Sequence, residues 1–123
     1  TIKSAEKQSK GKLYLLVAIR GSRGEIINRV NAEAVAHSLK NVNHQLIITS
    51  SVEVVNEANR VKPSEKEVFT QIIDENSLEY LFFDKLIDAL KFALNSAKKS
   101  DTILLIGAQG MDPAKKLLQE IDY

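Results

Sequence analysis

The stretch that decides the fold is KLYLLVAIRGSRG, residues 12–24. Its first eight residues form a nearly continuous apolar run, which is typical of a strand covered on both faces of a sheet. A glycine-rich turn ends the run, and Ser22 with Glu25 has the spacing of a capping box for a following helix. That helix is predicted to end near Lys40, and its apolar residues lie on one face: Ile27, Val30, Ala34, Val35 and Leu39.

The rest of the chain alternates between strand and helix patterns. Strands are predicted at residues 44–50, 78–83 and 101–107, whereas residues 51–62 indicate only a turn and a loose helix. Three further helices have start signals: Ser64 with Glu67 as a capping box after Pro63, Asp84 as an N-cap, and Asp112 as an N-cap before Pro113.

This alternation predicts the fold class. Strands separated by helices of roughly 10 to 15 residues imply right-handed crossovers and parallel pairing. We therefore predict a three-layer α/β domain of Rossmann-like type, with a mostly parallel sheet and helices on both faces. A length of 123 residues and a hydrophobic share of 44% fit one domain over residues 1–123.

The composition excludes several classes of function. The chain has no cysteine, so it has no disulfide or cysteine nucleophile, and this fits a reducing, cytoplasmic location. Seventeen basic and sixteen acidic side chains are spread along it, so we expect neither nucleic acid nor a membrane as partner. No apolar run reaches the roughly 20 residues of a membrane-spanning helix. His37 and His44 are interpreted as surface residues, and no metal-ligand spacing is present.

Ligands of open parallel sheets bind at the carboxyl ends of the strands, which directs attention to the turn after the first strand. Arg20 and Arg23 lie in this turn, where backbone amides at a helix start and two guanidinium groups favour phosphate or carboxylate. A tight turn with two solvated arginines explains the same residues equally well. The turn matches neither the dinucleotide fingerprint nor the P-loop, so a self-contained nucleotide site is not expected.

Two other strand ends supply further candidates. The turn after the last strand contains Gln109, Gly110 and Asp112, and the Asp112 carboxylate is better explained as an N-cap than as a ligand contact. Thr49 and Ser50 offer hydroxyls after the second strand, but no histidine is near them in sequence to make a hydrolase. Residue types alone do not identify a function.

Taken in order, the segments resemble the C-terminal domain of the Mur ligase family, closest to the UDP-N-acetylmuramoyl tripeptide synthetase branch. LLVAIRGSRG (residues 15–24) stands where that branch has a strand and a glycine-rich turn with an arginine. The most specific match is DTILLIGAQGMD (residues 101–112), preceded by the helix LIDALKFALNSAKKSD (residues 86–101). It mirrors an apolar strand followed by a Gly-Lys-Gly-His-Glu type turn. The resemblance covers nearly the whole chain.

The resemblance implies a role in an amide-bond ligase of peptidoglycan synthesis. Such enzymes use ATP to convert a carboxylate into an acyl phosphate, which the amino group of an amino acid attacks. This chain would be an excised C-terminal domain that starts inside its first helix, without its first motif and the central ATPase domain. It would act as a lid that contacts the nucleotide, the amino acid and a UDP-muramoyl-peptide-like substrate. ATP and Mg would be held mainly by the central domain, so the chain alone would bind no cofactor tightly and have no catalytic residue or activity.

The family's site residues carry over unevenly. Arg23 aligns best with the turn arginine, Arg20 is the second candidate, and Asn28 falls near an expected basic pair. Residues 49–53 occupy the place of the Asp-Asn-Pro-Arg motif that reads the amino acid. Lys, His and Glu are common at three positions of the last turn that here hold other residues, namely Gln109, Met111 and Asp112. The binding candidates are Arg20, Arg23, Asn28, Thr49, Ser50, Gln109, Gly110 and Asp112.

Two other functions stay open. A ligase-derived domain that has lost its chemistry would serve as a binding or regulatory module, and the altered motif residues motivate this alternative. An unrelated flavodoxin-like or Rossmann-like binding domain would reach the same pattern through shared fold physics.

Overall fold

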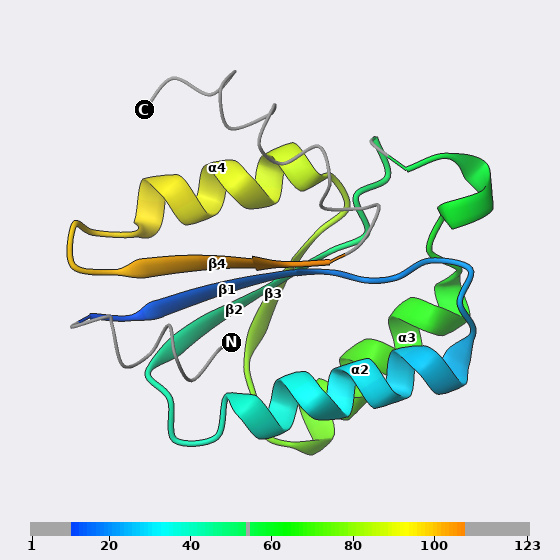
Figure 1. Ribbon diagram of the computed structural model, residues 1–123, viewed down its shortest axis with the longest axis horizontal. Helices are drawn as coiled ribbons and strands as arrows, with labels where there is room; N and C mark the ends of the chain where they lie inside the picture. The colour runs from blue at the N-terminus through cyan, green and yellow to red at the C-terminus, as the bar shows by residue number, and fades with distance from the viewer. Residues whose placement is uncertain (1–10, 54, 108–123) are drawn as a thin grey trace.

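The computed structural model describes residues 11–53 and 55–107, which form alternating strands and helices (Figure 1). The predicted strand-helix alternation is confirmed as far as the fourth strand; the helix predicted to open at Asp112 lies outside the described residues. The elements are β1 (Leu13–Ala18), α2 (Glu25–Ser38), β2 (His44–Thr49), the 3-10 helix η1 (Glu57–Asn59), α3 (Pro63–Glu75), β3 (Tyr80–Phe83), α4 (Leu86–Ser96) and β4 (Thr102–Ile106).

The four strands form one parallel sheet in the order β3-β2-β1-β4. Leu15 of β1 pairs with Leu46 of β2 on one side and with Leu104 of β4 on the other. The chain therefore extends from β1 to β2 and β3 in one direction and then returns to add β4 at the opposite edge. In sheets of this kind the order reverses beside β1, so the carboxyl ends of β1 and β4 flank the topological switch point.

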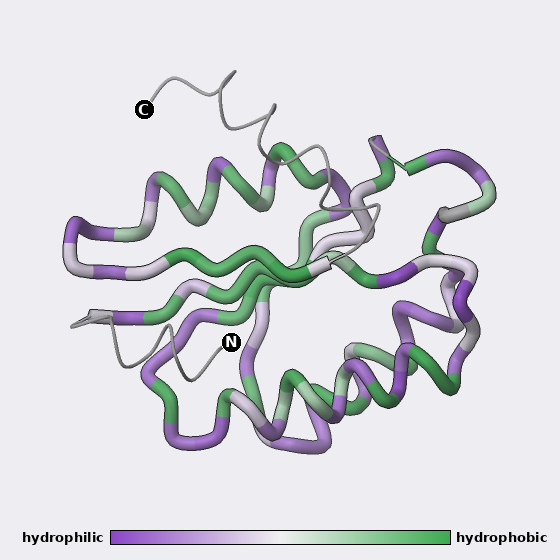
Figure 2. The backbone as a smooth tube through the Cα atoms, in the orientation of Figure 1, coloured by the Kyte–Doolittle hydropathy of each residue, from purple (hydrophilic) through white to green (hydrophobic). Residues whose placement is uncertain are grey.

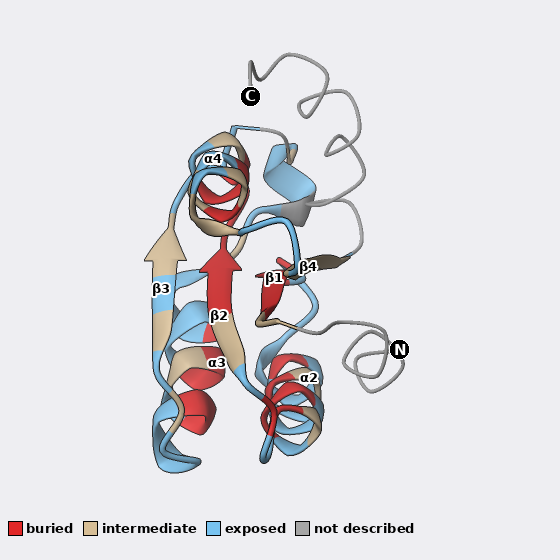
Figure 3. Ribbon diagram, turned by 90° about the vertical axis from the view of Figure 1, so that its left-hand side faces the viewer, coloured by how far each residue is buried: buried red, intermediate tan, exposed pale blue. Residues whose placement is uncertain are grey.

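Helices cover both faces of the sheet, as the sequence predicts (Figures 1 and 3). Successive β1 side chains point to opposite faces because strand side chains alternate. Leu13, Leu15 and Val17 pack into the core under α2 and α3, whereas Tyr14 and Leu16 pack under α4. The central strands are hydrophobic along most of their length (Figure 2), which is what burial on both faces requires.

The buried face of α2 differs from the predicted one. Ile26 is 78% exposed and Val30 57% exposed, and Ile27 is exposed as well, so the predicted stripe through Ile27, Val30 and Ala34 is wrong as a core face. Val35 and Leu39 do reach the core. The helix carries apolar residues on two sides. The side that packs against the core includes the polar residue Asn28, whereas the side with Ile27 and Val30 faces outward. The buried residues of α2 are Asn28, Ala32, Val35 and Ala36.

A partly apolar cavity lies between α2 and the β1–β4 side of the sheet. Its volume is about 380 Å³, and its lining includes Val17, Arg20, Ala34, Phe69 and Ile106. Residues of α2 and α3 share one core with β1 and β2, while β4 lies at the edge of the sheet beside β1, so the cavity opens at this edge. None of the helices within residues 11–53 and 55–107 is both long enough and apolar enough to cross a membrane.

Candidate functional site

The turn between β1 and α2 presents a row of backbone N–H groups at the carboxyl edge of the sheet. Ser22 has a φ of 59° and Gly24 a φ of 94°, values that place both residues in the left-handed half of the Ramachandran map. Left-handed residues within a tight turn aim successive amides at one point, and such concavities bind anions. The turn therefore has the anion-binding backbone geometry that its glycine-rich sequence predicts.

An internal carboxylate fills this geometry. Glu65, in the first turn of α3, accepts hydrogen bonds from Ser22 N at 2.8 Å, Arg23 N at 2.9 Å and Gly24 N at 2.8 Å. It also accepts one from Lys62 N at 2.9 Å, while Glu65 N donates to Lys62 O at 3.0 Å. The Glu65 side chain therefore hydrogen-bonds to backbone N–H groups that precede both α3 and α2.

The Glu65 carboxylate is held in its charged form. The residue is only 1% exposed. Burial by itself raises the pKa of Glu65, but the N–H groups of Lys62, Ser22, Gly24 and Arg23 together outweigh burial, so its pKa lies below the usual value. We conclude that Glu65 acts as a built-in anion for the turn.

Asn28 completes the network from α2. It is fully buried, and its Nδ2 donates to Arg20 O and Gly24 O at 3.0 Å each and to Glu65 Oε2 at 3.1 Å. Three acceptors around one nitrogen fix the orientation of the amide, because the flipped amide would place an oxygen against them. Its Oδ1 has no hydrogen-bond partner among the described residues. Asn28, a candidate ligand contact from the sequence, is therefore buried and hydrogen-bonded to the β1–α2 turn and to Glu65.

The amides of the turn are occupied by Glu65, but the side chains of its two arginines face solvent. Arg20 and Arg23 are both exposed. Since the Arg23 amide bonds to Glu65 and the Arg20 carbonyl accepts from Asn28, the backbone that carries both guanidinium groups is anchored. A phosphate or carboxylate that approached this edge would meet arginine side chains, not free backbone amides.

The hydrogen bonds at the starts of α2 and α3 differ from the capping boxes that the sequence predicts. α2 begins at Glu25 after Gly24 and has no side-chain cap, and Ser22 Oγ instead donates to Arg60 O at 3.0 Å, so the Ser22–Glu25 capping box is wrong. α3 begins at Pro63, one residue before Ser64, and Glu65 replaces Glu67 as the reciprocal partner. Both corrections have one cause: Glu65 reaches a turn more than 40 residues away in sequence.

The end of β2 is a second buried polar region. Thr49 Oγ1 accepts a hydrogen bond from Ser51 N at 3.0 Å, and Thr49 is fully buried, so this candidate residue organises the loop. Ser50 is also buried, although it lines a cleft that is described below. The remaining candidates, Gln109, Gly110 and Asp112, lie outside the described residues.

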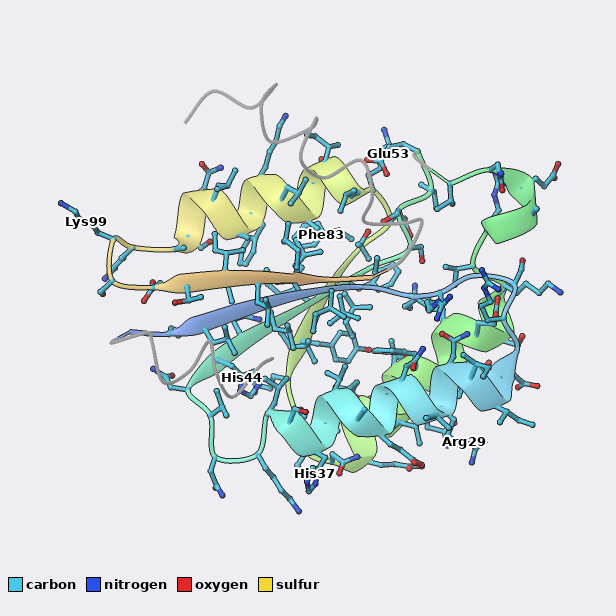
Figure 4. All side chains as sticks on the ribbon, viewed as in Figure 1. Arg29, His37, His44, Glu53, Phe83 and Lys99 are labelled. Carbon is cyan, nitrogen blue, oxygen red and sulfur yellow. The ribbon has the colours of Figure 1, made fainter. Side chains whose placement is uncertain are left out.

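The loop after β2 also caps α4. Glu53 Oε1 accepts from Leu86 N at 2.8 Å and Oε2 from Ile87 N at 2.9 Å, while α4 itself begins after Lys85. Asp84 was the predicted N-cap, and this prediction is wrong, because the orphan amides of the helix are satisfied from a loop 33 residues earlier in the chain. Figure 4 shows Glu53 beside this helix start.

Replacing Glu53 with alanine is expected to lower the free energy of unfolding by about 1 kcal/mol, since it removes a cap and a helix-dipole partner. Chemical denaturation monitored by circular dichroism measures the loss. Glu57→Ala, at an exposed position of η1 in the same connection between β2 and α3, is the matched control. Equal losses in the two variants would contradict the capping role.

Histidine and metal chemistry find no support at this edge. Figure 4 places His37 near the end of α2 and His44 at the start of β2, on the side of the molecule opposite Glu53. In the part of the chain that the structure describes, no three His, Asp or Glu side chains come together as a metal site would require. The polar groups gathered at the carboxyl edge are arginines, lysines, hydroxyls and carboxylates.

Comparison with known proteins adds no relative: the sequence matches no protein-family model and no curated protein. The geometry of the site therefore supplies the argument for function.

Proposed function

We propose that this chain is the closing C-terminal domain of an ATP-dependent carboxylate–amine ligase resembling UDP-N-acetylmuramoyl tripeptide synthetase. One observation carries the proposal: Arg20 and Arg23 stand exposed on an anchored turn at the carboxyl edge, beside the topological switch point, while Glu65 occupies the amides of that turn. A domain that bound its own nucleotide would need those amides for phosphate. A domain that reaches toward a phosphate held elsewhere needs only the arginines.

The arginines suit the charge of the proposed reaction. ATP, bound with Mg mainly by a central domain, supplies the phosphoryl group that activates the carboxylate of a UDP-muramoyl-peptide-like substrate. When the domain closes, Arg23, with Arg20 beside it, donates fork-shaped hydrogen bonds to phosphate or carboxylate oxygens. Preorganised donors stabilise charge as it develops, because they need not reorient during the reaction. Closure also excludes water, which would hydrolyse an acyl phosphate before the amino acid attacks it.

The test uses the full-length parent protein. Arg23→Ala is expected to lower kcat for amino-acid-dependent ADP release by about 100-fold, the effect of losing one preorganised donor to transition-state charge. Arg29→Ala is the matched control, because Arg29 is an exposed arginine on α2 that Figure 4 shows pointing away from the sheet. Unchanged turnover in Arg23→Ala would remove the proposed role of this residue.

A binding or regulatory module is the second candidate. It is favoured by one observation: Glu65 occupies the amides of the β1–α2 turn, so this backbone has no anion site left for a nucleotide. Full-length protein that binds ATP through an intact P-loop yet ligates none of the amino acids offered would support this candidate. Amino-acid-dependent ADP release would support the ligase.

A further inference from the structure

A cleft of about 530 Å³ lies at the carboxyl ends of β2 and β3, beside the first turn of α3. Its polar lining consists of Ser50, Arg60, Lys62, Lys66 and Asp84. These residues come from the end of β2, the segment before α3, the start of α3 and the end of β3, so the fold brings them together from distant parts of the sequence. The cleft is separate from the exposed guanidinium groups of the β1–α2 turn, which do not line it.

The cleft has an excess of positive charge. Three cations face one carboxylate, and within the described residues no ion pair neutralises Arg60, Lys62 or Lys66. Lys62 is moreover the N-cap of α3, at the positive end of the helix dipole, where serine, threonine, asparagine or aspartate is favoured.

Ser50 provides an independent indication of a ligand. It is 6% exposed and lines the cleft, and its hydroxyl has no hydrogen-bond partner in the described part of the chain. Among the described residues, Asn28 Oδ1 is the buried side-chain atom without a partner, so the Ser50 oxygen is open to the cleft. A hydroxyl placed in this way can donate a hydrogen bond to a ligand oxygen in the cleft.

The backbone that carries Arg60 and Lys62 is anchored before any ligand arrives, and the Lys66 side chain has a contact of its own. Lys62 N donates to Glu65 Oε1, and Arg60 O accepts from Ser22 Oγ, so the backbone of both residues is tied to the turn after β1. Lys66 Nζ lies 3.8 Å from the centroid of the Phe82 ring, a cation–π contact that positions its charge over β3. Preorganised groups lose less entropy on binding, which favours affinity for a small ligand.

We propose that this cleft binds a small organic or inorganic dianion, whose oxygens contact Arg60, Lys62 and Lys66 and accept a hydrogen bond from Ser50. A phosphate group and a pair of carboxylates share this chemistry, because both present several charged oxygens to guanidinium and ammonium donors. Asp84 limits the charge of the site and repels the ligand from the β3 side. The proposal does not depend on the ligase function, because its three cations are not among the ligase binding candidates and Ser50 alone belongs to both sets.

The test titrates the full chain at pH 7 and low ionic strength with inorganic phosphate and, separately, with glutarate. Binding is followed by NMR chemical shifts. We expect saturable binding of at least one probe with Kd of about 1 mM, and the tighter probe identifies the source of the dianion. Arg60→Gln and Lys66→Gln, which keep the backbone contacts, should each weaken binding about tenfold. Ser50→Ala should weaken it less, and Asp84→Asn should strengthen it.

Lys99→Gln is the matched control, because Lys99 is exposed at the opposite end of the molecule (Figure 4). Its binding should equal that of the unmodified chain, and thermal unfolding of each variant confirms that the fold is retained. Absence of saturable binding for both probes overturns the proposal. Equal weakening by Lys99→Gln and Lys66→Gln also overturns it, since the binding would then reflect only the overall charge.

Discussion

Replacing Glu65 with glutamine is expected to lower the free energy of unfolding by about 2 to 4 kcal/mol at pH 7. The glutamine keeps the size of the side chain but loses its charge, and its NH₂ group turns one acceptor into a donor. That donor then faces N–H groups of Ser22, Arg23, Gly24 or Lys62. A loss of this size is a large part of the roughly 5 to 15 kcal/mol that stabilises a domain. Urea denaturation measures it.

Glu67→Gln is the matched control, because Glu67 lies on the same helix and is exposed. We expect a loss below about 0.5 kcal/mol, as is usual for surface substitutions. If both variants lost the same stability, the effect would come from the charge of α3 and the built-in anion would be wrong.

The pH dependence of the Glu65 effect has a definite sign. A carboxyl whose pKa is lowered in the folded state contributes stability that is fully present above its unfolded pKa and is lost as the pH falls through the folded pKa. The difference in unfolding free energy between the unmodified chain and Glu65→Gln should therefore shrink at acidic pH. Asp101, whose pKa is lowered by the Lys98 and Lys12 amides, contributes equally to both proteins and cancels in this difference.

Local sequence patterns predict the strands and helices of this fold well, because each element is specified mainly by the residues within it. The apolar run over residues 12–19 becomes β1, followed by Ile19, and every residue from Leu13 to Ile19 is buried. Leu86, Leu90 and Ala93 of α4 recur at helical spacing and pack against the sheet. In these segments the hydrophobic period and the packing geometry point to the same structure, so no tertiary information is needed.

The site could not be predicted in the same way, because its contacts join residues that are far apart in sequence. A capping box is a pattern of four consecutive positions, and Ser64 with Glu67 satisfies it formally. The structure instead uses Glu65, whose other partners are Ser22, Arg23 and Gly24. Likewise, Glu53 caps α4 from a loop in which no sequence pattern indicates a cap.

The inward face of α2 shows the same limitation. An apolar count favours a core face through Ile27 and Val30, since an asparagine scores as a surface residue. Asn28 is buried because its Nδ2 serves the turn and Glu65, and its position rotates Ile27 and Val30 outward. Two of the acceptors of Asn28 are carbonyls of the preceding turn, and the third is the Glu65 carboxylate on α3. The polar network, not hydrophobicity alone, therefore sets the orientation of α2.

Replacing Asn28 with aspartate is expected to destabilise the domain by about 3 to 5 kcal/mol at pH 7. Aspartate has the shape of asparagine, so it leaves no cavity. It replaces a nitrogen that donates to Arg20 O, Gly24 O and Glu65 Oε2 with an oxygen, and it places a second carboxylate against Glu65. Two buried carboxylates in contact cannot both ionise without a large cost. Urea denaturation at pH 7 measures this loss.

A double-mutant cycle separates this charge repulsion from the loss of hydrogen bonds. In the protein with both Asn28→Asp and Glu65→Gln, the amide and the carboxylate exchange places, so one donor and one charged acceptor again face each other. The double variant should therefore be more stable than the sum of the two single losses predicts, by at least about 1 kcal/mol. Strictly additive losses would mean that the two side chains do not interact energetically. The orientation of α2 would then have to come from apolar packing by Ala32, Val35 and Ala36 alone.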